Sequence, residues 1–195
     1  MNLYDLLQDN AGVNITINSD MLNTLLDDVQ PVDFKAIIHP NATENEKVTA
    51  PDRQKYVVIV EELLRLATVR QWGICKNAAF VYLYNGAFWS ELDKEVLQNF
   101  LGSSAERMNM PKYDARQYTV REHLLKQFLV TGFQAMPENN EKILINLKNG
   151  TFEIDNEGNG ILRPVNKADF LKYQLPFEYI PNIQQNFVTE KSIYE

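Results

Sequence analysis

The spacing of apolar residues near the start of the chain predicts short helices. Apolar side chains recur three and four positions apart, as they do along one face of a helix. The residues on these faces are Leu3, Leu6 and Leu7 for a first helix and Met21, Leu22, Leu25, Leu26 and Val29 for a second. Ser19 is the expected N-cap of the second helix, which we expect to end before Pro31. A short apolar segment, Val32–His39, follows, and the polar stretch Asn41–Ala50 is predicted to be a surface loop.

The longest helical pattern comes next. Thr49 can cap this helix, Pro51 suits its first turn, and Asp52 favours the positive end of the helix dipole. The apolar face contains Tyr56, Ile59, Val60, Leu63, Leu64, Leu66 and Ala67. The β-branched run 57–60 would also suit a strand, but the helical pattern around it is longer. We expect the helix to end at Gly73.

Two Asn-Gly dipeptides predict β-hairpins. Asn85-Gly86 lies between AAFVYLY and AFWSEL, and Asn149-Gly150 lies between KILINLK and TFEID. Asn-Gly is the preferred pair for a type I′ turn because both positions need a positive φ. The sequence DNEGNG predicts a further turn, and ILRPV predicts a third short strand. Trp89 alternates with Phe88 on its strand, and we expect it to pack in the core.

Two helices are predicted between the hairpins. Ser90 and Asp93 open the first, which Gly102 closes. Its apolar residues are Val96, Leu97, Phe100 and Leu101. A polar connection, SSAERMNMPKYD, leads to the second helix, where Thr119 and Glu122 form a capping box. Its apolar residues are Leu124, Leu125, Phe128 and Leu129, and Gly132 is expected to end it.

These elements predict an α+β fold, with helices, two Asn-Gly hairpins and a small antiparallel sheet. We expect an acidic helical region over residues 1–48, an α+β domain over residues 49–181 and a polar tail over residues 182–195. A winged-helix-like part is an alternative, with Ser90–Gly102 and Thr119–Gly132 as the helix pair and Lys142–Asp155 as the wing.

The composition narrows the class of protein. With 195 residues, 45% of them hydrophobic, the chain can bury a sizeable core. Its one cysteine, Cys75, forms no internal disulfide, which fits a reducing cytoplasm. The first residues are acidic, and no apolar run approaches the roughly 20 residues that cross a bilayer. We therefore expect a cytoplasmic protein that is neither exported nor embedded in a membrane.

Motifs for catalysis and cofactor binding are absent from the sequence. There is no phosphate-binding GxxxxGK[ST], no GxSxG and no GxGxxG after a predicted strand. Cys75 and two distant histidines, His39 and His123, cannot assemble a standard zinc site. We therefore predict no catalytic residues, no metal and no cofactor.

Charge is unevenly distributed, although the net charge is −7. Residues 1–50 hold two basic and eight acidic residues, whereas Arg65–Lys126 holds nine basic and six acidic residues. The most basic part contains Arg107, Lys112, Arg116, Arg121 and Lys126, with Tyr113 and Tyr118 between them.

Two interpretations of this stretch remain open. Cations placed on phosphates and rings stacked on bases are what single-strand binding uses. The other interpretation is an ordinary solvated helix face. On that view Arg121, close to the middle of an apolar face, must extend to solvent or find a partner.

The C-terminal third resembles a known family. The segments KILINLKNGTFEI and ILRPVNKADFLKYQLPFEYIP are similar to the region that precedes the helicase in phage, plasmid and poxvirus primase–helicases, the D-five N-terminal-like domain. The residues that carry the resemblance are Asn146, Asn149, Gly150, Tyr173, Leu175, Pro176, Phe177, Tyr179 and Pro181. The hairpin FVYLYNGAFWSEL also resembles the family, so the likeness spans about Gln54 to Pro181.

The resemblance implies a non-catalytic domain of a phage- or mobile-element-type DNA primase/helicase. In such proteins a superfamily-three AAA+ helicase domain follows, often with a primase domain upstream. The implied role is to engage DNA, single-stranded or forked, or to form the collar of a ring through its own helicase domain or neighbouring subunits.

Two departures from the family limit what this chain is expected to do. After Pro181 the family continues into an aromatic-rich helix and the ATPase, and no primase-like acidic motif comes before the domain. We therefore expect an excised domain or a stand-alone relative, and assign it neither ATP hydrolysis nor priming. Two alternatives stay open: a protein–protein interaction module that docks through the acidic helices without DNA contact, and a winged-helix reader of duplex DNA.

Overall fold

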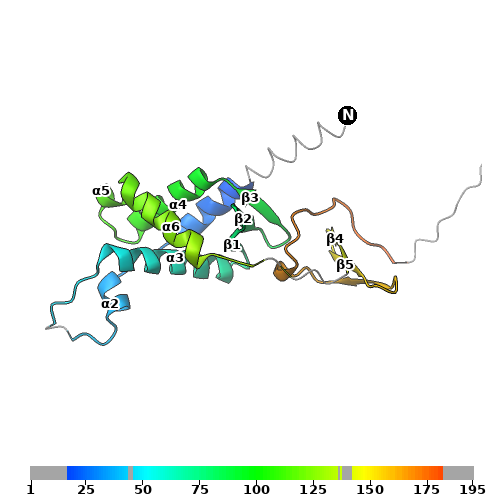
Figure 1. The fold of residues 1–195 in the computed structure, drawn as a ribbon, viewed down its shortest axis with the longest axis horizontal. Helices are drawn as coiled ribbons and strands as arrows, with labels where there is room; N and C mark the ends of the chain where they lie inside the picture. The colour runs from blue at the N-terminus through cyan, green and yellow to red at the C-terminus, as the bar shows by residue number, and fades with distance from the viewer. Residues whose placement is uncertain (1–16, 44–45, 136, 138–141, 182–195) are drawn as a thin grey trace, which may run out of the picture. The chain divides into compact units, whose positions relative to one another are not determined.

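The computed structural model describes residues 17–43, 46–135, 137 and 142–181. Within these residues the fold is α+β, with six helices and two three-stranded antiparallel sheets, as predicted (Figure 1). The predicted first helix, with Leu3, Leu6 and Leu7, and the predicted tail 182–195 lie outside the described residues.

The chain divides into two compact units. The first contains Met1–Glu138 and Lys167–Tyr173, and the second contains Asn139–Asn166 and Gln174–Glu195. The chain therefore leaves the first unit, returns to it for one short segment, and leaves again. The helix pair that a winged-helix reader would use lies in the first unit, and the hairpin that would serve as its wing belongs to the second.

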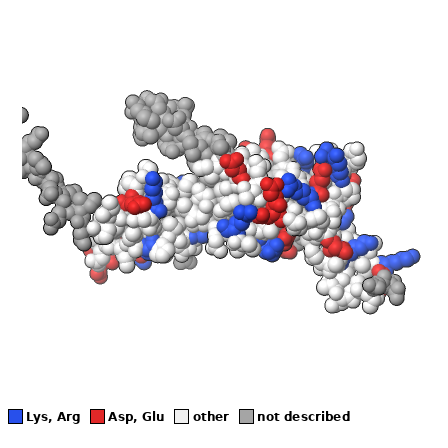
Figure 2. Space-filling model, turned by 180° about the vertical axis from the view of Figure 1, so that it is seen from behind, with Lys and Arg blue, Asp and Glu red and all other residues white. Residues whose placement is uncertain are grey.

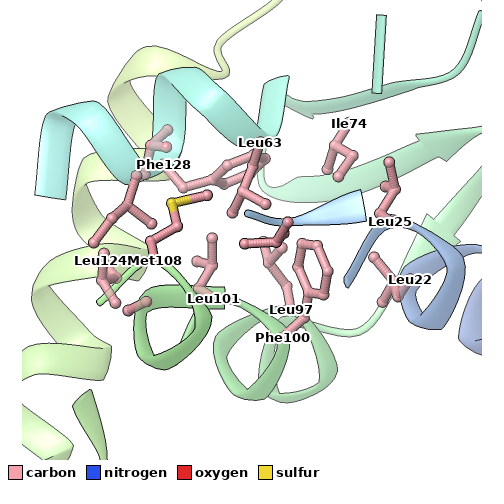
Figure 3. Packing of buried hydrophobic residues seen from close by; sticks show 14 of the residues in the cluster. Leu22, Leu25, Leu63, Ile74, Leu97, Phe100, Leu101, Met108, Leu124 and Phe128 are labelled. Carbon is pink, nitrogen blue, oxygen red and sulfur yellow. The ribbon is translucent and has the colours of Figure 1, made fainter. Parts of the chain in front are cut away.

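The helices of the first unit enclose its main core. They are residues 17–28, α2 (Phe34–Ile38), α3 (Asp52–Val69), α4 (Lys94–Arg107), α5 (Lys112–Ala115) and α6 (Tyr118–Thr131). Helix α6 contacts both α3 and α4. Figure 3 shows leucines and phenylalanines from residues 17–28, α3, α4 and α6 gathered in one core, which also contains Met108 and Ile74. Burial of these apolar side chains is the main driving force for folding of the first unit.

Helix boundaries differ from the prediction in the first half of the chain. Ser19 lies inside the helix of residues 17–28 and is not its N-cap. Pro51 rather than Thr49 is the N-cap of α3. The helix ends at Val69, not at Gly73, because the chain reverses at Gln71 with a φ of 61°.

Gly102 does not end its helix, because α4 continues to Arg107. Its position is explained by the neighbouring helix α6. A Cβ atom at residue 102 would lie 2.8 Å from Arg121 Nε and 3.1 Å from Arg121 Cγ. Glycine is therefore needed for close approach of the Arg121 side chain and not for a helix end.

The predicted capping box is also wrong. Helix α6 begins at Tyr118 with Gln117 as N-cap, and no side chain caps it. Thr119 and Glu122 thus lie inside the helix, and Glu122 pairs with Lys126 at 3.7 Å. The end at Gly132 is as predicted. The polar connection before α6 is largely helical, because it contains the end of α4 and the short helix α5.

Sheet A consists of β1 (Gly73–Asn77), β2 (Phe80–Tyr84) and β3 (Trp89–Leu92) in that order. Strand β1 was not predicted, because it is almost continuously buried and shows no alternation. One face of the sheet joins the helical core. The other face is covered by the returning segment Lys167–Tyr173, whose Phe170 stacks on Trp89 with ring centroids 5.0 Å apart. Trp89 is 1% exposed, which confirms its predicted place in the core.

Sheet B consists of β4 (Ile143–Leu147), β5 (Gly150–Ile154) and β6 (Gly160–Arg163) in that order. Both predicted hairpins are present, but neither has the predicted turn. Gly86 and Gly150 have positive φ, at 98° and 146°, whereas Asn85 and Asn149 do not.

The two asparagines have other roles. Asn85 Oδ1 accepts hydrogen bonds from the N–H groups of Ala87 and Phe88, both at 2.9 Å, in a longer connection. In sheet B the two-residue loop is Lys148-Asn149, and Gly150 is already the first residue of β5. Asn149 instead holds the backbone of Tyr179, donating to its oxygen at 2.9 Å and accepting from its nitrogen at 3.0 Å.

Candidate nucleic-acid interface

The corner formed by α5 and the start of α6 carries the two most exposed aromatic rings of the described residues. Tyr113 is 82% exposed and Tyr118 is 75% exposed. Local packing explains this exposure. Met110 and Ala115 are buried on either side of Tyr113, while Tyr118 begins α6 on the side away from its buried residues. Both rings are therefore exposed to solvent, while neighbouring residues of the same segments are buried and hold the backbone in place.

Three of the five predicted cations act on one carboxylate in this corner, Arg116 by direct hydrogen bonds and Lys112 and Arg121 through their charge. Arg116 donates two hydrogen bonds to Glu106, at 2.9 Å from Nε and 3.2 Å from Nη2. These hydrogen bonds hold the pKa of the Glu106 carboxyl below its usual value, and the charges of Arg116, Lys112 and Arg121 lower it further. Lys112 itself makes no hydrogen bond or ion pair with the described residues.

Arg121, which lies near the middle of the apolar face of α6, finds a partner and does not simply extend to solvent. Its stem lies against Gly102, where a side chain would clash, and its Nη1 donates to Asn99 Oδ1 at 2.8 Å. Its Nε is buried without a hydrogen-bond partner among the described residues. Arg121 is thus held in place by α4 and is not a freely moving surface cation.

The other two predicted cations have separate partners. Arg107 donates to the Leu26 oxygen at 2.6 Å and pairs with Asp27 at 3.0 Å, so it ties the end of α4 to the helix of residues 17–28. Lys126 lies about two turns along α6 from Tyr118 and pairs with Glu122. The structure therefore brings together Lys112, Arg116 and Arg121, and not the whole predicted stretch.

On the face of the molecule drawn in Figure 2, basic and acidic side chains are interleaved and form no broad basic surface. This distribution agrees with the net charge of −7. Any attraction for an anion must therefore be local to the cluster and short in range at physiological salt.

We also searched the described residues for a reactive cysteine, a metal site and a membrane-spanning helix. Burial raises the pKa of the Cys75 thiol to about 12, so it stays protonated at neutral pH and is a poor nucleophile. Within the described ranges, no group of three or more His, Cys, Asp or Glu side chains could hold a metal ion. None of the described helices is both long and apolar enough to cross a membrane.

Sequence reasoning missed two residues of this corner. Glu106 was assigned to a polar connection, and Asn99 was not singled out. A glutamate ten positions before an arginine gives no recognisable pattern, because the two meet only through the turn that α5 makes. The glycine inside an apolar helix, Gly102, was the one available indication of a close contact.

Comparison with known proteins gives one result. Residues 61–193 match the family model described as D5 N terminal like. The matched region covers more than half of the chain and includes both sheets together with α4, α5 and α6. No curated protein and no solved structure matches the chain.

Proposed function

The chain belongs to the D5 N-terminal-like family, whose domain is found in primase–helicase type proteins, and from this membership we propose that it engages single-stranded DNA during replication. The proposed interface is the corner of α5 and α6. In this role the domain is non-catalytic, and NTP hydrolysis and priming belong to other parts of a primase–helicase.

The observation that carries the proposal is the pair of exposed tyrosines beside a cluster of cations. Tyr113 and Tyr118 make no ring contact with another described aromatic side chain, and most of each side chain is exposed to solvent. Stacking of a base on an aromatic ring contributes roughly 1–3 kcal/mol and tolerates any base. Single-strand binding without sequence preference uses this combination of rings and backbone cations.

The charge of the protein predicts the strength of this binding. Because the net charge is −7, long-range attraction is weak and the affinity should be micromolar or weaker, at about 10⁻⁶ M or above. The ion pair between Arg116 and Glu106 opposes binding only weakly, since exposed pairs contribute about 0–1 kcal/mol. Binding should weaken steeply as salt rises, because released counterions supply much of the free energy.

A second function is favoured by the second unit. Its exposed apolar side chains include Ile143 at 61% and Ile161 at 63%. Exposed apolar side chains suit contact with another protein where several of them lie together in one patch. We therefore keep as an alternative that this unit contacts a neighbouring subunit or a helicase domain in a ring-shaped assembly.

The test is DNA binding by the full chain, measured by fluorescence anisotropy with a labelled oligothymidylate at low salt. The double variant Tyr113→Ala/Tyr118→Ala should bind at least roughly tenfold more weakly than the parent, because two stacking surfaces are lost. The matched control, Phe80→Ala/Phe133→Ala, removes two exposed rings elsewhere in the first unit and should bind like the parent. Equal weakening by both double variants, or no binding by the parent, would contradict the proposed interface.

A further inference from the structure

Glu106 occupies a position that suits a phosphate group. The planar fork of Arg116 contacts both of its carboxylate oxygens. A guanidinium fork binds two oxygens of a phosphate with the same geometry. The carboxylate of Glu106 therefore stands where an oxyanion of a ligand could be held.

The surrounding charges are arranged around this one carboxylate. The positive charges of Lys112 and Arg121 add to that of Arg116 in lowering the pKa of Glu106. The Arg121 side chain also lies against Gly102, which is one turn before Glu106 on α4. Of the other carboxylates in the corner, Glu122 pairs with Lys126. The pKa of the Tyr56 phenol is raised mainly by burial, with smaller contributions from Asp52 and Asp114. Glu106 is thus bonded by Arg116, and Lys112 and Arg121 add positive charge around it.

The three cations are fixed to different degrees. Arg121 is positioned by Gly102 and Asn99, whereas Lys112 is exposed and has no ion-pair partner among the described residues. Arg116 is the group whose partner would have to change. It ends the short helix α5, so its side chain can turn from Glu106 to a ligand without any change in the packed helices.

We propose that Lys112, Arg116 and Arg121 form a cradle for a backbone phosphate of single-stranded DNA and that Glu106 is an internal competitor that occupies this cradle in the free protein. The inference rests on the proposed function and adds which cations bind the DNA phosphate and which carboxylate competes with it. Tyr113 lies next to Lys112 in the chain, so a base stacked there would bring its phosphate close to the cradle.

The proposal has a direct consequence for the variant Glu106→Gln. Glutamine keeps the length of the side chain and an oxygen that accepts from Arg116, but removes the negative charge that competes with phosphate. DNA binding should therefore tighten by about three- to fivefold at low salt, the range expected for one exposed charge pair. Glu61→Gln, on the exposed side of α3, makes the same change in net charge away from the corner and should alter the affinity by less than half as much.

A second pair of variants tests whether Arg116 is the shared group. Arg116→Gln should weaken DNA binding, and in this background Glu106→Gln should no longer tighten it, since the competitor has lost its partner. Glu106→Asp, which keeps the charge, should not tighten binding. All variants are compared as full chains whose circular dichroism matches that of the parent.

The outcomes separate the inference from the proposed function. If the parent binds oligothymidylate and Glu106→Gln binds no more tightly than Glu61→Gln, the cradle is overturned while single-strand binding stands. A gain that persists in the Arg116→Gln background also overturns it. If neither the parent nor Glu106→Gln binds, the proposed function falls and the inference falls with it.

Discussion

Sheets A and B have the same topology but differ in what surrounds them. Each is a three-stranded antiparallel meander, and each contains an Asn-Gly dipeptide. In sheet A both faces are covered, one by the helical core and the other by the segment that carries Phe170. In sheet B half of the strand residues are only partly buried, and Ile143 and Ile161 are exposed.

The difference lies in the source of stability. Sheet A is held by side-chain packing, and no residue of its strands, all of which are described, makes an ion pair. Sheet B depends on polar contacts and backbone conformation. Glu153 pairs with Lys142 and Arg163, and Asp155 accepts hydrogen bonds from the backbone of Glu157 and Asn159 in the β5–β6 turn. An Asn-Gly dipeptide thus occurs both in a largely buried sheet and in one that is mostly only partly buried or exposed.

The largest effect is expected in sheet A. Trp89→Ala should lower the free energy of unfolding of the first unit by about 3–5 kcal/mol, because it leaves a cavity beneath Phe170. The measurement is urea unfolding followed by circular dichroism. Phe80→Ala is the control on the same sheet, since Phe80 is 49% exposed and should cost below about 1 kcal/mol. Similar losses for both variants would mean that packing does not distinguish the two positions.

The glycines of the two hairpins should respond differently to alanine. At Gly150 a Cβ atom would lie 2.5 Å from the Arg163 backbone oxygen, in addition to the strain of a φ of 146°. At Gly86 a Cβ atom meets nothing within 4 Å, so only the conformational strain at a φ of 98° remains. We expect Gly86→Ala to cost about 1 kcal/mol, and Gly150→Ala to cost more than about 2 kcal/mol and to unfold sheet B first.

This comparison is measured by NMR, with the amide signals of each sheet followed during urea titration. Loss of the sheet B signals at lower urea in Gly150→Ala, with the sheet A signals unchanged, is the expected result. Equal midpoints for the two glycine variants would show that the contact with Arg163 is relieved by a small shift of β6.

Much of the fold could be predicted because the information is local. The positions of α3, α4, α6 and both hairpins follow from apolar spacing and from turn residues. Errors occurred where a distant contact overrides a local preference. Gly102 appeared to be a helix end but provides space for Arg121, and strand β1 has no alternation because Lys167–Tyr173 returns to cover its second face.

The candidate site was predictable in its residue types but not in its arrangement. Clustered cations and interleaved tyrosines are visible in the sequence, and Tyr113 and Tyr118 are in fact exposed. The sequence alone does not reveal that Arg107 pairs with Asp27, 80 positions away in the chain, or that Arg116 pairs with Glu106. Partners of charged side chains depend on the tertiary fold, so a count of charges cannot show which of them are available to a ligand.

The smallest expected effect concerns the response of sheet B to acid. Hydrogen bonds from Lys142 and Arg163 hold the pKa of the Glu153 carboxyl below its usual value of 4.5. Because the pKa is lower in the folded protein, the stabilisation is fully present above about pH 4.5 and is lost as the pH falls through the folded value. Sheet B should therefore loosen in acid, seen as loss of its amide NMR signals, while Glu153→Gln removes this part of the pH dependence. The hydrogen bonds from Asn159 also lower the pKa of Asp155, so a weaker dependence should remain in that variant. An unchanged pH profile in Glu153→Gln would show that its ion pairs add nothing to the stability of sheet B.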